Sequence, residues 1–337
     1  MSEHSPLQAH SPLPMPKFLH LFHHRTSPLA QPVEEHAQAW LHHYRLPEDP
    51  ALRERVARTC LGTTTASVYP GAGQEVLELG ADLIIWLTAF DDTHVEAPGS
   101  TAAHLTEQLA VFAGILEQGG PTTGTGFASA LADLVRRMHT ALTPGQRARL
   151  TSSFYTAFLG WNWELSLHGR PVGLDEYNAM RPHTVYGSIV TTLIEPGAGL
   201  DLPDGVRDTP DIRQLNRTAS LLSGWINDLY SFTYEQGTQS PPPSLPTVLA
   251  HQHHLPLPEA FATAVRMFDD KAGEMHQKIT QLRTSPTPGV AAYATACAEF
   301  VASNKLFYGV TRRYTAAQPQ PSHLQHAKRA GGVTSRS

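Results

Sequence analysis

The sequence predicts an all-α protein, and two observations support this prediction. Apolar residues recur at helical spacing along most of the 337-residue chain, and strong breakers such as Pro70-Gly71 and Gly119-Gly120-Pro121 separate the segments that show it. We find no stretch of alternating β-branched residues bounded by hairpin turns. A bundle of helices without a sheet is therefore expected.

Helical spacing begins near the N-terminus, where one predicted helix face carries Val33, Ala37, Trp40, Leu41 and Tyr44. Similar spacing predicts further helices over 49–61, 74–91, 102–117, 126–141, 144–168, 174–195, 209–235, 257–282 and 287–315. The ends of the chain show no such period. We expect a disordered leader over 1–16, a single domain over 17–316 and a flexible tail over 317–337.

Composition excludes several classes of function. Hydrophobic residues make up 41% of the chain, which is enough to build a substantial core. The formal net charge of −5 leaves no broad basic surface, so we expect no nucleic-acid partner. Two cysteines and the lack of a signal-peptide pattern favour a reducing, cytoplasmic setting. No membrane span is predicted, because the longest apolar candidate, Leu79 to Phe90, is interrupted by Asp82.

A first acidic motif closes the apolar stretch WLTAFDDTHVE at residues 86–96. Asp92 and Glu96 are four residues apart and share a helix face, while Asp91 lies about 100° around the axis from Asp92. Carboxylates this close repel one another, and hard oxygen ligands of this type suit Mg²⁺. Taken alone, the motif is also consistent with a solvated acidic helix end.

A second copy of the same DDxxxE pattern stands at Asp269, Asp270 and Glu274. Lys271 and Lys278 lie nearby to neutralise it, and no comparable apolar helix leads into it. We therefore interpret this copy as a solvated surface face.

A polar stripe lies within the apolar stretch GWINDLYSFTYE at residues 224–235. Asn227, Ser231 and Glu235 follow at intervals of four, so an amide oxygen, a hydroxyl and a carboxylate share one helix face. Such a stripe can chelate one cation. The alternative is a set of internal hydrogen bonds, since buried polar groups need partners.

These motifs resemble those of the bacterial class I terpene cyclases. FDDTHVE is similar to the aspartate-rich motif of that family, and NDLYSFTYE matches its NSE motif at all the ligand positions. Arg181 stands where the family has a sensor arginine, and Arg313-Tyr314 matches a terminal RY pair. The resemblance extends from His24 to Tyr314.

The resemblance implies a class I terpenoid synthase α-helical bundle with a central active-site cavity. It implies three Mg²⁺ ions and an isoprenyl diphosphate as the small-molecule substrate, which is ionised and cyclised with release of diphosphate. The metal residues would be Asp91, Asp92, Glu96, Asn227, Ser231 and Glu235. Asp91 would bridge two ions, and Asp92 is expected to pair with an arginine. Arg181, Arg313 and Tyr314 would bind diphosphate.

Family position also suggests which side chains face the hydrocarbon, although each could instead be plain core. These candidates are Phe90, Thr88, Thr184, Val185, Phe307 and Tyr308. The sequence departs from the family in having Val185 for a glycine, Thr88 for an aromatic residue, Phe307 for tryptophan and Tyr234 for lysine. We favour farnesyl diphosphate and a sesquiterpene product. Geranylgeranyl diphosphate and a diterpene product are the alternative.

Other interpretations explain less of the sequence. An isoprenyl chain-elongating synthase shares the fold and metals but needs a second aspartate-rich motif, which the Asn227–Glu235 stripe replaces. A di-iron bundle needs Glu-x-x-His pairs, and the chain has none. A non-enzymatic scaffold leaves the polar stripe unexplained. The histidines at 251, 253 and 254 are interpreted as solvated. The family resemblance is compatible with a homodimer.

Overall fold

The computed structural model describes residues 21–121, 123–235 and 241–311. Every regular element in these ranges is a helix, which confirms the predicted fold class. The helices are α1 (Ala30–Tyr44), α2 (Pro50–Ala57), α3 (Leu61–Val68), α4 (Gln74–His94), α5 (Ala102–Gln118), α6 (Gly126–Ala141), α7 (Pro144–Ser166), α8 (Leu174–Thr184), α9 (Gly187–Thr192), α10 (Ile194–Gly197), α11 (Asp204–Arg207), α12 (Pro210–Glu235), α13 (Leu245–His253), α14 (Leu257–Leu282) and α15 (Val290–Val310).

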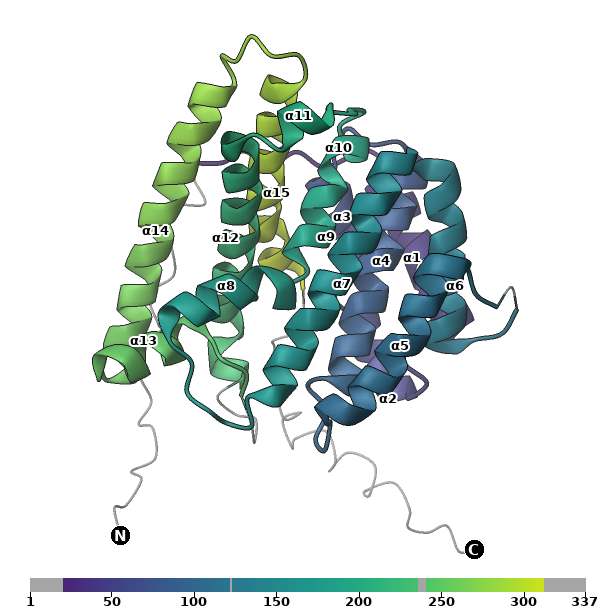
Figure 1. Ribbon diagram of the computed structural model, residues 1–337, viewed down its shortest axis with the longest axis horizontal. Coiled ribbons are helices and arrows are strands. Elements are labelled where there is room, and N and C mark those ends of the chain that lie inside the picture. Colours follow the sequence, from purple (N-terminus) through teal and green to yellow (C-terminus); the bar gives the residue numbers. More distant parts are fainter. Residues whose placement is uncertain (1–20, 122, 236–240, 312–337) are drawn as a thin grey trace, which may run out of the picture.

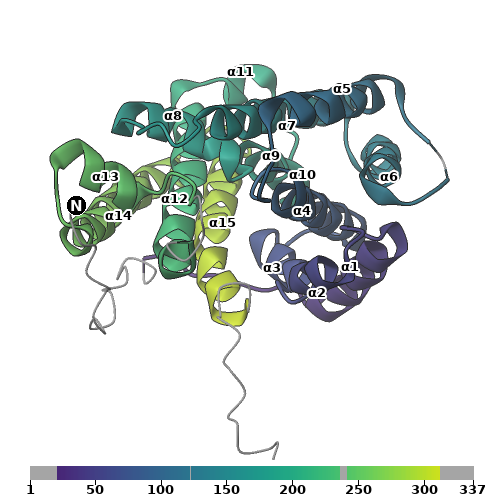
Figure 2. The ribbon, with the colours of Figure 1, turned by 90° about the horizontal axis from the view of Figure 1, so that it is seen from below.

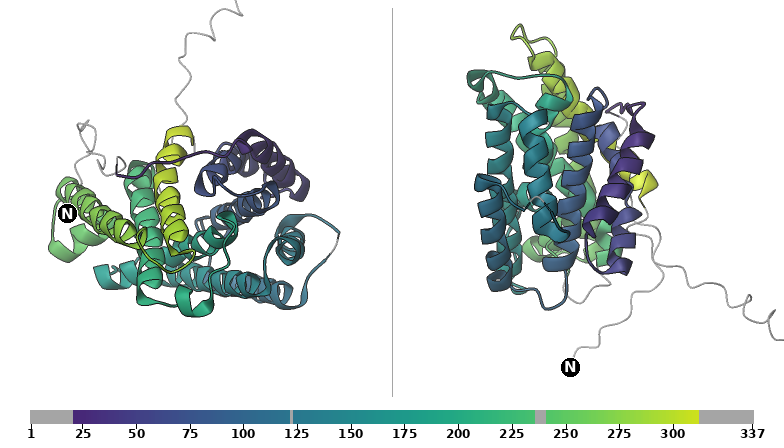
Figure 3. Two further views of the ribbon diagram at one scale, coloured as in Figure 1. Left: turned by 90° about the horizontal axis from the view of Figure 1, so that it is seen from above. Right: turned by 90° about the vertical axis from the view of Figure 1, so that its right-hand side faces the viewer.

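The bundle has two halves, each built around one long helix (Figure 1). In the first half, α4 packs against α1, α3 and α6, and in the second half α12 packs against α9, α14 and α15. Helix α15 also packs on α3 and so joins the halves. Seen end-on in Figures 2 and 3, α9 and α15 lie beside α12 on the side that faces α4. The two helices that carry the metal motifs therefore belong to different halves.

Two predicted helices differ from those in the structure: one is shorter and one is broken. The helix predicted over 49–61 ends at Ala57 as α2, and a separate helix, α3, begins at Leu61 after Cys60, which adopts a left-handed backbone conformation with φ 55°. The segment 174–195 divides into α8, α9 and α10, with a bend at Tyr186, whose φ is 58°. Gly187 follows the bend, and a β-carbon there would stand 2.4 Å from Cβ of Ser220, so the chain passes close against α12. Helices α3, α11 and α13 were not among the predicted elements.

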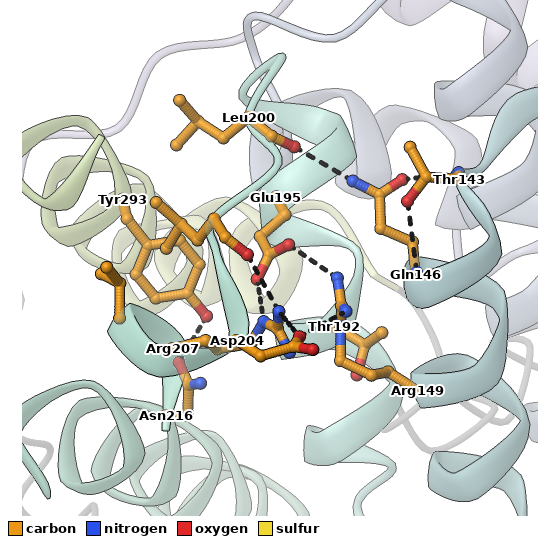
Figure 4. Close-up of polar contacts among 12 residues, drawn as sticks. Thr143, Gln146, Arg149, Thr192, Glu195, Leu200, Asp204, Arg207, Asn216 and Tyr293 are labelled. Atoms are coloured by element: carbon orange, nitrogen blue, oxygen red, sulfur yellow. Dashed lines mark hydrogen bonds and ion pairs between the residues drawn. The ribbon is translucent and has the colours of Figure 1, made fainter. Parts of the chain in front are cut away.

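Buried ion pairs fasten helices together at the end of the bundle near α10 and α11 (Figure 4). Glu195 is only 2% exposed and accepts from Nη2 of Arg149 at 2.8 Å and Nε of Arg207 at 2.6 Å. The same Arg207 bonds Oδ1 of Asp204 at 2.7 Å. One carboxylate thus connects α7, α10 and α11.

A second buried carboxylate, Asp82, fastens the first half of the bundle. Its Oδ2 is 2.5 Å from Nη1 of Arg137 on α6 and 2.8 Å from Nε2 of His36 on α1. Asp82 has no exposed surface, so these partners offset the cost of burying its charge. The acid that interrupts the apolar stretch before the first motif therefore serves the packing of α4.

The second DDxxxE copy lies on α14, where Asp270 and Glu274 are exposed. Lys271 pairs with Glu274 at 2.5 Å, as the sequence suggested. Lys278 instead pairs with Asp211 of α12 at 2.6 Å, which corrects its predicted role as a neutralising partner of the motif. The helical pitch turns Lys278 toward the neighbouring helix.

The histidine cluster and the cysteines singled out in the sequence show no sign of a second site among the described residues. The three histidines at the end of α13 are exposed, and the described ranges hold one acidic or histidine cluster able to bind a metal, the first acidic motif. Cys60 and Cys297 are not joined in a disulfide bond. Among the described residues, no helix combines the length and the apolar character that a membrane crossing needs.

Candidate active site

The first acidic motif lies at the C-terminal end of α4. Asp91 is half-buried, Asp92 is buried and Glu96 is exposed, and one carboxylate oxygen of each lies within 4.8 Å of the others. Three carboxylates at this spacing repel one another, and the helix dipole disfavours negative charge at a helix C-terminus. The arrangement therefore fits a divalent metal with oxygen ligands.

Asp92 has an arginine partner, as predicted from the family resemblance. Nη2 of Arg55 on α2 is 3.7 Å from Oδ1 of Asp92, whose side chain has no exposed surface. The guanidinium also stands 5.7 Å from the ring centre of Tyr234 on α12. Arg55 thus bridges the two motif helices. Sequence reasoning missed it because it lies on a short polar helix far from both motifs in the chain.

The polar stripe lies on the last turns of α12, which is one continuous helix as predicted. Ser231 is fully buried and donates its hydroxyl to the backbone oxygen of Asn227 at 2.7 Å. Burial raises the pKa of Glu235 to about 7, and the nearby charges of Asp228 and Glu96 act in the same direction. The charge of Glu96 therefore helps to raise the pKa of Glu235, although the two residues belong to different halves of the bundle.

Arg181 lies at the end of α8 against the polar stripe. Its Nη2 is 2.6 Å from Oδ1 of Asp228 and 2.8 Å from Oδ1 of Asn227. Its Nη1 donates to Oγ1 of Thr184 at 3.0 Å. The side chain is 12% exposed, and Nε is buried without a hydrogen-bond partner in the described part of the chain. Donors thus remain for a further acceptor.

Two acidic residues beside Arg181 were missed by the sequence analysis. Asp228 is 1% exposed and accepts from the hydroxyl of Tyr177 and the backbone amide of Leu245. Burial raises the pKa of Glu164 on α7 to about 7, with the charge of Glu96 as the next cause and Arg181 opposing it. Each of the two stands as a carboxylate inside an apolar helical stretch of the sequence. Glu164 directly follows Trp163, and Asp228 lies within NDLYS. This pattern could have indicated both residues.

The structure moves one predicted cavity residue into the core. Phe90 has no exposed surface, and its ring stacks on Trp86 at 5.5 Å and contacts Trp161 at 4.9 Å. Phe90 is thus packed among other aromatic rings, and its expected place in the cavity lining stays a prediction. Position 90 falls on the side of α4 that faces α5, α6 and α7, where further rings pack against it.

Other predicted cavity residues lie around the polar stripe. Thr184 accepts a hydrogen bond from Arg181. Val185 follows α8 with an ordinary φ of −97°, and the left-handed residue of the bend is the next one, Tyr186. The hydroxyl of Tyr308 accepts from Nδ2 of Asn227 at 3.0 Å, and its ring stacks on Tyr230 at 4.2 Å.

Phe307 is half-buried with its ring 4.8 Å from that of Tyr308, and Thr88 is half-buried on α4. The two other predicted diphosphate residues, Arg313 and Tyr314, lie outside the described residues.

Two pockets lie away from this site. They adjoin each other, with volumes of about 300 and 450 Å³, and both are lined by Arg25, Arg283 and Glu299. Neither contains a residue of the acidic motif or the polar stripe. We therefore do not assign the chemistry to them.

An all-α bundle that brings an aspartate-rich helix end, an Asn/Ser/Glu stripe and a buried arginine together defines a class I terpenoid synthase. Comparison with known proteins agrees with this class. Residues 82–274 match the model of terpene synthase family 2, C-terminal metal binding. The chain belongs to this family, and it is thus a bacterial-type terpene synthase, a lyase that acts on an isoprenyl diphosphate.

Individual relatives differ in the products they are named for. A labda-7,13(16),14-triene synthase from Streptomyces clavuligerus is 41% identical over 89% of this chain and 88% of its own. A T-muurolol synthase of the same organism, named as cyclising farnesyl diphosphate, is 28% identical over 86% of this chain and 71% of its own. The fold matches 2-methylisoborneol synthase from Streptomyces coelicolor A3(2) with a TM-score of 0.78 at 20% identity, covering 88% and 98% of the two chains.

Proposed function

We propose that this terpene synthase ionises a C20 isoprenyl diphosphate with Mg²⁺ and releases a diterpene hydrocarbon or alcohol. The observation that carries the proposal is the meeting of Arg181, Asn227 and Asp228 beside carboxylates from both halves of the bundle. This arrangement gives a diphosphate its cationic partners at one place.

The chain's own carboxylates fit a cluster of divalent metals. Burial raises the pKa values of both Glu164 and Glu235 to about 7, with Glu96 adding to the effect, and a bound cation would favour their charged forms. We propose that Asp91, Asp92 and Glu96 hold metal on one side, and that Asn227, Ser231 and Glu235 hold it on the other. Three Mg²⁺ ions are expected from the family resemblance. When bound, they supply Lewis acidity and make the diphosphate a competent leaving group.

Arg181 is proposed to bind the diphosphate with its remaining donors. Charge-assisted hydrogen bonds from a guanidinium to phosphate oxygens are strong and geometrically specific. Arg313 and Tyr314 are proposed as further diphosphate contacts on family position alone. Thr184 fixes the orientation of Arg181 and so acts on the diphosphate indirectly.

The carbocation requires an apolar surface that excludes water and does not itself react with the carbocation. The stacked rings of Tyr230 and Tyr308 and the neighbouring Phe307 lie next to Asn227 of the polar stripe. We propose that they face the allylic end of the substrate, where ring faces stabilise positive charge. Thr88 and Val185 are proposed to shape the rest of the cavity.

The length of the substrate is inferred from the relatives. Farnesyl diphosphate is favoured by the sequence analysis, but the relative named for a labdatriene, a C20 hydrocarbon, is more similar than the relative named for cyclising farnesyl diphosphate. We therefore propose the C20 alternative. Sesquiterpene synthesis is the second candidate. A homodimer and a cytoplasmic location stay predictions.

The test is product formation from each chain length. Purified protein is incubated separately with geranyl, farnesyl and geranylgeranyl diphosphate, and with a bicyclic labdane-type C20 diphosphate, in Mg²⁺ or in EDTA. Gas chromatography with mass spectrometry of a solvent overlay identifies products. We expect a Mg²⁺-dependent product from a C20 substrate. A product from farnesyl diphosphate alone would establish the second candidate, and no product from any of them would contradict the proposal.

A further inference from the structure

His36 on α1 lies between two carboxylates of α4. Its Nε2 is 2.8 Å from Oδ2 of Asp82, and its Nδ1 is 3.6 Å from Oε2 of Glu78. Glu78 and Asp82 are four residues apart on α4, so their side chains share one face of that helix. A single imidazole ring therefore spans two acids of the helix that carries the first acidic motif.

Both contacts of His36 are attractive only when its ring carries two protons. A neutral imidazole has one N–H group and one lone pair, so one of the two carboxylates would face a lone pair. The charged imidazolium has an N–H group at each nitrogen and attracts both acids. The positions of Asp82 and Glu78 therefore favour the protonated form of His36.

Asp82 draws on this positive charge. Its side chain has no exposed surface, and its Oδ1 is buried without a hydrogen-bond partner in the described part of the chain. Its Oδ2 accepts from both Arg137 and His36. Arg137 is shared, since its Nη1 also lies 3.6 Å from Oδ2 of Asp133 on its own helix. The imidazolium thus adds to a compensation that Arg137 divides between two acids.

The charged groups around His36 act in both directions, and the acids prevail. The hydrogen bond to Asp82 raises the pKa of His36 above 6.5, and the charges of Asp82 and Glu78 add to this effect. Burial and the charge of Arg137 on α6 oppose it. Helices α2 and α3 also pack on α1, and α3 carries no charged side chain. The remaining arginines and acids of α2 and α6 have partners of their own: Glu54 pairs with Arg58, Arg55 with Asp92 and Asp133 with Arg136, while Arg53 bonds the backbone oxygen of Pro47.

We propose that His36 acts as a pH-sensitive clamp that fastens α1 to α4, and that α1 loosens when His36 loses its second ring proton. The clamp is separate from the proposed function, because none of its residues belongs to the proposed metal or diphosphate groups. The pKa of His36 is higher in the folded protein than in the unfolded chain. Its contribution is therefore complete below pH 6.5 and is lost as pH rises through the folded-state value.

Apolar packing limits how far α1 can loosen. The helix buries a stripe of side chains against its neighbours, formed by Val33, Ala37, Trp40, Leu41 and Tyr44. These contacts do not titrate, so α1 stays on the bundle when the clamp opens. Loss of the proton should therefore appear as more frequent local opening of α1 rather than as unfolding of the whole protein.

The experiment combines a titration with hydrogen exchange on the full, metal-free chain. Proton NMR follows the ring signal of His36, which is assigned by its absence from His36→Gln. Hydrogen–deuterium exchange with mass spectrometry measures the protection of α1 at about pH 6 and about pH 8.5, on either side of the expected titration. Protection is corrected for the intrinsic exchange rate, and α14 is the internal reference. Glu78→Gln removes one of the two acids, and His42→Gln is the matched control, since His42 is an exposed histidine of the same helix.

We expect His36 to titrate above pH 6.5 and the protection of α1 to fall at least about threefold between the two pH values, because the clamp is lost over this range. In Glu78→Gln the pKa of His36 should be lower. In His36→Gln the protection of α1 should not depend on pH and should equal the wild-type value at high pH. His42→Gln should behave like the wild type.

Two outcomes would overturn the clamp. One is a pKa of His36 at or below 6.5 in the wild type. The other is an equal pH dependence of α1 protection in the wild type and in His36→Gln. Glu78→Gln keeps the partners of Asp82 and remains decisive if His36→Gln does not fold, since an unchanged pKa of His36 in that variant would contradict the clamp as well.

Discussion

Gly224 of α12 leaves room for Arg181 of α8. A β-carbon at Gly224 would stand 2.7 Å from Cγ of Arg181, closer than real β-carbons come to other heavy atoms. The side chain of Arg181 thus crosses α12 at the one turn where that helix lacks a side chain. Any residue larger than glycine at position 224 must displace the arginine from Asn227 and Asp228.

Gly224→Ala is therefore expected to raise KM for the diphosphate by about tenfold, the loss of roughly one charged hydrogen bond. Steady-state kinetics with the preferred substrate measures this. The matched control is Gly273→Ala on α14, where a new β-carbon has open space. KM equal to wild type in Gly224→Ala would show that Arg181 does not depend on this contact.

The first acidic motif and its copy on α14 should differ sharply in mutational effect. Asp91→Ala and Glu235→Ala are expected to lower turnover at least about a thousandfold, because each removes a proposed metal ligand. Asp270→Ala alters an exposed side chain and should leave kcat/KM near wild type. Product formation at saturating Mg²⁺ measures all three variants. An inactive Asp270→Ala would mean that the catalytic motif is the other copy.

Arg55 should matter for activity although it lies on a short surface helix. Arg55→Met removes the partner of buried Asp92 and the contact with Tyr234, and kcat/KM should fall about tenfold. Arg58→Met is the control, because Arg58 is 61% exposed and, among the described residues, forms an ion pair only with the nearby Glu54 of α2. Equal activity of both variants would exclude a role for Arg55 in ordering the site.

The stability of the metal-free protein should fall as pH rises from about 4.5 to 7. Burial raises the pKa of Glu164 and of Glu235 from 4.5 to about 7, so in this window the folded protein binds more protons than the unfolded chain. Each group should contribute about 1 kcal/mol, allowing for its partial exposure. Urea unfolding in EDTA at several pH values measures the slope. Glu164→Gln should flatten it, and a slope identical to wild type would contradict the assignment.

Glu195 should be a stability residue without a role in the chemistry. Glu195→Ala leaves Arg149 and Arg207 without their buried partner and should lower the free energy of unfolding by about 3–5 kcal/mol. Asp204→Ala removes a partner of the same arginines that is 84% exposed, and it should cost much less than Glu195→Ala, because solvent screens the exposed pair. Denaturant unfolding of both variants compares them. Equal losses would show that burial does not set the strength of this cluster.

Local periodicity made much of this protein predictable. Helices bury one stripe of side chains, so the apolar spacing predicted α4 and α12, and the four-residue interval placed Asn227, Ser231 and Glu235 on one face. The breaks at Cys60 and Tyr186 were not predictable, because neither is a glycine or proline and both adopt a left-handed backbone conformation. Their conformation follows from neighbouring helices rather than from local preference.

The sequence by itself determined the helical class and the family and predicted the two metal motifs, since these depend on residue types at short, regular spacings. Only the tertiary structure decided that Arg55 is the partner of Asp92, that Phe90 packs in the core, and that Arg181 rests on Asn227. Such contacts join residues far apart in the chain. These contacts depend on how whole helices pack and turn against one another, and the spacing of residues within a single helix does not determine that packing.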